Sequence, residues 1–217
     1  MAISLSKGQN VNLSKVSPSS KKFLIGLGWD LRATDGADFD LDASAFAQGA
    51  DGKVTSDDDF VFYGAKEHPS KAIIHNGDNR TGAGGGDDES IIIDVSLLPA
   101  ALTKVAIACT IFEAQARSQN FGMVSNAYIR IVDADTNTEI ARYDLSEDYS
   151  VETALIFGEL YLHNNEWKFK AVGYDTAGAV EPGGGSLTHE HNMVFAQPDA
   201  AEVSARLLTR HADLLPD

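Results

Sequence analysis

The chain has 217 residues, a length that favours one full-sized domain with an appendage over two domains of equal size. Its 32 acidic residues outnumber 17 basic ones, and the resulting net charge of −15 opposes direct binding to nucleic-acid phosphates or anionic lipid. The single cysteine, Cys109, excludes an internal disulfide and is expected to be a buried core residue. We find neither a secretory signal nor a membrane-spanning stretch, so we expect a cytoplasmic protein.

Strands are predicted along most of the chain, because short apolar runs alternate with turn residues. The first run, 23–30, ends at Asp30, and the next, 42–47, is connected to 59–63 through an Asp51-Gly52 turn. Further runs of strand length follow at 90–95, 104–112, 128–133, 139–144, 158–163 and 166–172. The last two meet across Asn164-Asn165, which suits a type I′ turn.

Helix is predicted only in short connections, at 114–123 and 152–157, before residue 175. Several short strands at regular spacing, separated by such connections, are typical of a sandwich. The sequence therefore predicts an all-β fold, an antiparallel β-sandwich with short helical connections and a C-terminal helical tail.

The tail differs in composition from the rest of the chain. Residues 178–186 are small and predict a flexible linker, and 199–215 predict an amphipathic helix. One apolar stripe runs along this helix and comprises Val203, Leu207, Leu208, Leu214 and Leu215. We expect a sandwich domain over 1–177 and a tail over 178–217, with the stripe packing on its own protein or on a second copy.

Two acidic segments predict a metal site. In the first, Asp38, Asp40 and Asp42 alternate with apolar residues, so an extended backbone places the three carboxylates on one face. Asp30 lies just before this segment. The second segment, 77–89, is rich in glycine, which allows the tight turns that direct backbone carbonyls inward, and it carries Asp78, Asp87, Asp88 and Glu89.

Charge repulsion strengthens the prediction of a bound cation. Residues 30–42 hold five Asp against Arg32 alone. Two like charges about 4 Å apart repel by roughly 4 kcal/mol at an effective dielectric constant near 20, and a divalent ion would remove that cost. Oxygen donors without clustered His or Cys favour Ca²⁺ or Mg²⁺. The alternative is a solvated acidic surface, which is how we interpret the run 57–59.

The second segment does not follow the EF-hand pattern. Counting from Asp78 places Glu89 correctly at position 12, but Arg80 and Ala83 occupy positions 3 and 6. We therefore expect a calcium site built on strands.

Five motifs follow one another along the chain: Gly26-Leu27-Gly28-Trp29-Asp30, Asp38-Phe39-Asp40-Leu41-Asp42, Gly77-Asp78-Asn79-Arg80-Thr81-Gly82, Gly86-Asp87-Asp88-Glu89-Ser90 and Phe157-Gly158-Glu159-Leu160-Tyr161. With these motifs the chain resembles the TerD family of tellurium-resistance and stress-response proteins over residues 3–174. The resemblance implies a bacterial cytoplasmic β-sandwich that binds two calcium ions and assembles with other Ter proteins near the inner membrane. The implied ligands are Asp30, Asp38, Asp40, Asp42, Asp78, Asn79, Asp87, Asp88 and Glu89.

A calcium-loaded binding or scaffold protein, and not an enzyme, is the function that we expect. One alternative is a hydrolase that uses two carboxylates as acid and base, although the acidic residues cluster where metal ligands are wanted and no Ser-His-Asp arrangement is discernible in the sequence. The other alternative is a lectin-like or lipid-binding calcium sandwich. The lone Cys109 provides no dithiol for reducing or chelating an oxyanion.

Overall fold

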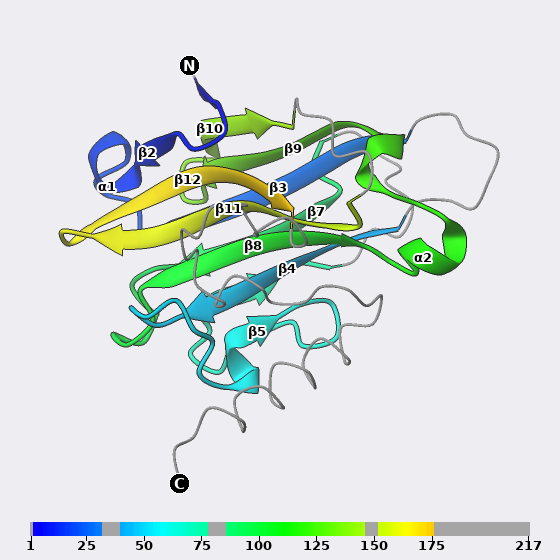
Figure 1. The fold of residues 1–217 in the computed structure, drawn as a ribbon. Helices are drawn as coiled ribbons and strands as arrows, with labels where there is room; N and C mark the ends of the chain where they lie inside the picture. Colours follow the sequence, from blue (N-terminus) through cyan, green and yellow to red (C-terminus); the bar gives the residue numbers. More distant parts are fainter. Residues whose placement is uncertain (1, 32–39, 78–85, 146–151, 176–217) are drawn as a thin grey trace, which may run out of the picture.

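The computed structural model describes residues 2–31, 40–77, 86–145 and 152–175, which form two six-stranded sheets packed face to face (Figure 1). Sheet A contains, from edge to edge, β1 (Ile3–Leu5), β10 (Thr138–Asp144), β9 (Val124–Asp133), β3 (Lys22–Leu31), β7 (Glu89–Asp94) and β6 (Ile73–His75). Sheet B contains β2 (Asn10–Asn12), β12 (Glu166–Asp175), β11 (Ala154–His163), β8 (Lys104–Ile111), β4 (Leu41–Gln48) and β5 (Phe60–Val61). The predicted β-sandwich is confirmed.

The main core lies between the sheets and follows the alternation of the strands. Ile25 and Leu27 of β3 are fully buried, as are Ile107 and Cys109 of β8. Period-2 side chains in a strand point to opposite faces, so these residues share the inner faces of their sheets. The expectation that Cys109 is a core residue is confirmed.

Short helical pieces connect the strands: α1 (Leu13–Val16), η1 (Asp57–Asp59), α2 (Ala114–Arg117) and η2 (Phe121–Met123). The last two confirm in part the helix predicted at 114–123. The β11–β12 hairpin also forms as predicted, because Asn164 and Asn165 both have positive φ, 53° and 58°. No helix among the described residues is long and apolar enough to cross a membrane.

Three expectations were wrong. The helix expected at 152–157 does not form, because residues 154–157 are the start of β11, where Leu155 and Phe157 alternate into the core and the strand pairs with β8. The sheets are not wholly antiparallel, because β1 pairs with β10 in parallel. Asp59 was expected in a solvated loop but is 5% exposed. The predicted tail helix at 199–215 lies outside the described residues.

Candidate functional site

The two acidic segments emerge at the same end of the sandwich. The first follows β3 and precedes β4, and the second follows β6 and precedes β7. Leu27 on β3 faces Glu89 on β7 in the antiparallel pair, so the residues beyond Leu27 and those before Glu89 are neighbours. This convergence, which the sequence could only suggest, is the geometric basis of the site.

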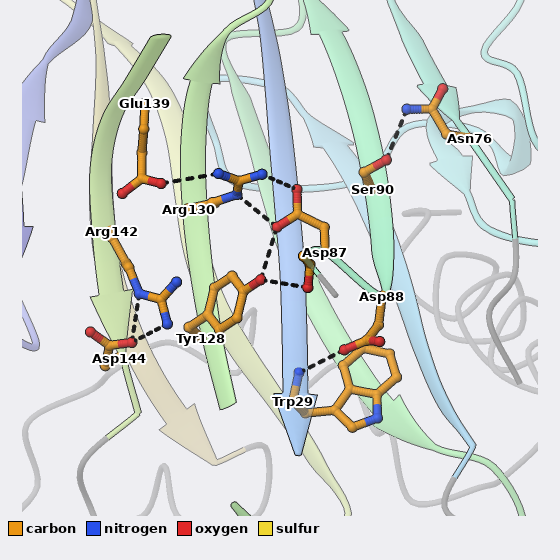
Figure 2. A network of polar contacts seen from close by, with 11 residues as sticks. Trp29, Asn76, Asp87, Asp88, Ser90, Tyr128, Arg130, Glu139, Arg142 and Asp144 are labelled. Atoms are coloured by element: carbon orange, nitrogen blue, oxygen red, sulfur yellow. Dashed lines mark hydrogen bonds and ion pairs between the residues drawn. The ribbon is translucent and has the colours of Figure 1, made fainter. Parts of the chain in front are cut away.

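Asp88 binds the end of β3 through both its backbone and its side chain. Its N–H donates to the carbonyl of Leu27 at 2.8 Å, and its Oδ2 accepts the N–H of Trp29 at 2.8 Å (Figure 2). Burial raises the pKa of the Asp88 carboxyl, and the negative charges of Asp30 and Asp87 raise it further, against the lowering effect of the Trp29 hydrogen bond. Negative charge is thus concentrated where the segments meet.

Asp30, near the end of β3, adds a further negative charge at the point where the segments meet. Its side chain is exposed and accepts a hydrogen bond from Asn126 Nδ2 at 2.8 Å. Because Asn126 belongs to β9, the amide fixes the Asp30 carboxylate from the strand on the other side of β3.

Asp87 points the other way, across the outer face of sheet A (Figure 2). Its two carboxylate oxygens accept from Arg130 Nε at 2.7 Å and Nη2 at 2.9 Å, and the hydroxyl of Tyr128 lies 3.1 Å from Oδ1. Arg130 also pairs with Glu139 at 3.0 Å. The hydrogen bond to Asp87 is the main reason that the pKa of Arg130 is raised. This bidentate pair positions the residue immediately before Asp88.

Glycine makes room for that pair. A Cβ at Gly26 would lie 2.1 Å from Asp87 Oδ2, and a Cβ at Gly28 would lie 2.4 Å from the ring of Tyr128. The Gly26-Leu27-Gly28 motif therefore lets two side chains lie flat on β3.

Glu89 points inward and connects the two sheets. Its carboxylate accepts the N–H of Ala43, the residue that follows the first acidic segment, and its side chain is fully buried. His75 Nε2 lies 3.6 Å from the same Glu89 oxygen and 3.2 Å from the carbonyl of Ala43. His75 Nδ1 accepts the N–H of Gly77 at 3.2 Å, an arrangement that assigns the proton of the neutral ring to Nε2.

His75 is a site residue that sequence reasoning missed. Its signal was a histidine closing the short apolar run 73–75 directly before the glycine-rich segment. Through their contacts with Ala43, His75 and Glu89 hold the glycine-rich segment next to the end of the first acidic segment.

Two further predicted ligands lie at the start of β4. Asp40 is 7% exposed and its carbonyl accepts the N–H of Phe112 at 2.8 Å. Asp42 is half-buried and lies between Leu41 and Ala43, which are both fully buried in the core, so its side chain points to the opposite face. The alternation predicted for this segment is confirmed there.

The predicted ligands Asp38, Asp78 and Asn79 lie outside the described residues. Among the residues that the structure does describe, no three His, Cys, Asp or Glu side chains converge closely enough to hold a metal ion. The carboxylates that the structure describes therefore lie at the ends of the two acidic segments.

A second polar cluster, also missed from the sequence, contains Ser70, His68 and Asp59. Ser70 Oγ lies 2.7 Å from His68 Nδ1, and His68 Nε2 lies 3.2 Å from Asp59 Oδ1. These are the residue types of a catalytic triad, but the ring nitrogens are exchanged, because a triad serine contacts Nε2 and its carboxylate contacts Nδ1. The backbone N–H of Ser70 also binds Nδ1, and Ser70 Oγ accepts the N–H of Ala72. The cluster therefore ties together the 68–72 turn and its neighbour η1.

Comparisons with known proteins point to one family over most of the chain. The TerD domain family model matches residues 1–182. Tellurium resistance protein TerD of Serratia marcescens is 57% identical over 180 residues, covering 83% of this chain and 94% of that protein. General stress protein 16U of Bacillus subtilis is 52% identical over 181 residues with the same coverage. The crystal structure of a TerD homologue from Streptomyces coelicolor shares the fold, with a TM-score of 0.57 and 21% identity over 72% of this chain and 92% of that one.

Proposed function

The chain belongs to the TerD domain family, and on that premise we propose that it is a calcium-binding protein of the bacterial response to tellurite and other stresses. It would act as a binding or scaffold module and not as an enzyme. The observation that carries the proposal is the concentration of Asp30 and Asp88 at the point where both acidic segments leave the sheets.

The donor chemistry of this end fits calcium. Carboxylate and carbonyl oxygens are the ligands that Ca²⁺ prefers, and it accepts them in irregular arrangements of six to eight, whereas Mg²⁺ needs near-ideal octahedral geometry. Burial and neighbouring charge already raise the pKa of the Asp88 carboxyl, so a cation would relieve an existing electrostatic cost.

The contacts of the described residues support two different roles for the predicted ligands. Asp30, Asp40, Asp42 and Asp88 would hold the ions together with Asp38, Asp78 and Asn79. Asp87 and Glu89 would support the site, because Arg130 binds both oxygens of Asp87 and the Ala43 N–H binds Glu89. Supporting contacts of this kind orient ligands and tune their affinity.

A bound ion would join the connection between β3 and β4 to the connection between β6 and β7. The first connection runs from sheet A to sheet B and the second joins two strands of sheet A, so the ion would stabilise the sandwich at this end and give its surface a defined shape. We propose that this surface binds other proteins of the Ter group, in the cytoplasm and near the inner membrane.

Calorimetric titration of Ca²⁺ into chelator-treated protein tests the proposal. Asp88→Asn keeps an oxygen for the Trp29 N–H but removes the charge, and we expect it to lose at least one site. Asp58→Asn is the matched control, because Asp58 is exposed in η1. Binding at both sites in both variants would refute the assignment, and equal loss in both would mean that general acidity attracts the ion.

Thermal unfolding gives a second readout. At a free calcium concentration about 100 times the dissociation constant, each site adds roughly 2.7 kcal/mol to the free energy of unfolding. We expect a clear rise in melting temperature with Ca²⁺ and a small one with Mg²⁺. Melting curves that coincide with calcium and with chelator would contradict the proposal.

A further inference from the structure

Part of the outer face of sheet B is apolar, where a sheet facing water would carry polar side chains. Ala45 of β4 and Ile107 of β8 point into the core between the sheets, so the residues next to them in each strand, Phe46, Ala106 and Ala108, point outward. Together with Ala154 and Phe60 they form a separate apolar cluster. Each side chain in this cluster is at most 4% exposed. We call Phe46, Ala106, Ala108 and Ala154 the outer apolar face.

The described hydrophobic side chains that pack on this face come from β5 and residues near it. Phe60 of β5 stacks on Phe46 with ring centroids 4.5 Å apart, and Phe62 stacks on Phe60 at 4.6 Å. Val54 is the other described hydrophobic side chain that packs on the cluster. The β4, β8, β11 and β12 strands form the nearer sheet in Figure 1, and no described helix crosses β8 or β11 there. No described helix therefore packs on the alanine floor of the face.

We propose that residues 199–215 of the same chain dock on the outer apolar face. The stripe predicted on that segment, Val203, Leu207, Leu208, Leu214 and Leu215, supplies large side chains to a floor made of small ones. The family match ends at residue 182, so this segment lies beyond the domain shared with the relatives.

The described chain ends in sheet B, and the residues that follow are numerous enough to reach the face. β12 ends at Asp175 in sheet B and is separated from β4 by β11 and β8, about 14 Å at roughly 4.8 Å per strand. The connection from 176 to 198 has 23 residues, and a flexible chain of that length has an end-to-end distance of about 26 Å. A helix over 199–215 would itself be about 26 Å long and could lie across β4, β8 and β11.

The tail is acidic, and the outer side of sheet B carries lysines, beside Glu159 opposite Lys170. Residues 178–217 contain six acidic side chains, at 181, 190, 199, 202, 213 and 217, against Arg206 and Arg210. Lys168 and Lys170 alternate along β12 with Phe169, which is buried in the core, so both lysines lie on the outer side of sheet B. Sheet A also exposes aliphatic side chains, where Leu24 lies opposite Ile92, but the chain does not enter the tail from that sheet.

Paramagnetic broadening in the full-length chain tests the docking. A spin label would be attached to Thr209→Cys, on the polar side of the predicted helix. Cys109 is fully buried and we expect it not to react, and wild-type protein taken through the same labelling is the control. We expect loss of amide signals from β4 and β8 and none from β3 and β7. Broadening in sheet A would overturn the choice of face, and no broadening in either sheet would overturn docking.

Two controls identify the segment that covers the face. Mixing spin-labelled protein without isotope with isotope-labelled protein without spin label detects contact between copies. If broadening of sheet B appears only through that contact, the occupant is a second copy and the proposal is wrong. Leu207→Asp, in the stripe, should abolish the broadening, whereas Ala205→Asp, on the other side of the helix, should leave it unchanged. An equal effect of the two substitutions would exclude the stripe as the contact surface.

Discussion

Replacing Gly26 by alanine should destabilise the fold through a side chain that is distant in sequence. The added Cβ would lie 2.1 Å from Oδ2 and 2.3 Å from Cγ of Asp87, far inside van der Waals contact. Gly26 lies within β3, where alanine is tolerated by the backbone. The Asp87 carboxylate would therefore have to move and give up its two hydrogen bonds from Arg130.

The size of the effect follows from opposing terms. A hydrogen bond to a charged group contributes about 1.5–3 kcal/mol. Arg130 is 30% and Asp87 12% exposed, so solvent screening reduces the contribution of the pair toward the low end. Alanine in place of glycine in a strand returns about 0.5–1 kcal/mol. We expect Gly26→Ala to lower the free energy of unfolding by about 1–2 kcal/mol.

Urea unfolding in a double-mutant cycle measures this prediction. Without the Asp87 carboxylate the alanine has nothing to displace, so Gly26→Ala in an Asp87→Ala background should be neutral or slightly stabilising. The coupling between the two substitutions should then approach the full cost of the single Gly26→Ala change. If Gly26→Ala costs the same in both backgrounds, the collision with Asp87 is not the cause and the reasoning fails.

Two further predictions concern single residues outside the acidic segments. Asp133 accepts hydrogen bonds from the Ser17 hydroxyl and from two backbone N–H groups, at 3.0 and 3.1 Å, and these bonds lower the pKa of its carboxyl. We therefore expect Asp133→Asn to lower the free energy of unfolding by about 1–2 kcal/mol at neutral pH. The control is Asp135→Asn, which should cost little because Asp135 is exposed. Because the pKa of Asp133 is lower in the folded state, the stabilisation is present above the unfolded pKa of about 3.9 and is lost as the pH falls through the folded pKa. Urea titrations from pH 7 downward should therefore show the stabilities of the two variants converging with that of wild type. A stability difference that persists in acid would contradict this. Asn164 has φ 53°, so Asn164→Ala should cost about 1 kcal/mol and Asn164→Gly should be neutral or stabilising in thermal unfolding, and equal losses would mean that the side chain and not the backbone is responsible.

Much of the candidate site could be predicted because its signals are local. The alternation of aspartates in the first segment and the glycines of the second are visible in a few consecutive residues, and both segments do meet at one end of the sandwich. Pairing partners are not local. Nothing in the sequence near Asp87 indicates that Arg130 would bind both of its oxygens, or that Glu89 would reach Ala43 in the other sheet.

The sequence by itself determined the strand pattern, the buried Cys109 and the positive-φ turn at Asn164-Asn165, because period-2 alternation and turn chemistry act over a few neighbouring residues. Only the tertiary structure decided that 154–157 belong to a strand, since an apolar run that short is compatible with helix or strand and pairing with β8 selects one. It also decided that Asp59 is buried, because hydrogen bonds from Thr55, Ser56 and His68 replace the water that a charged carboxylate otherwise requires.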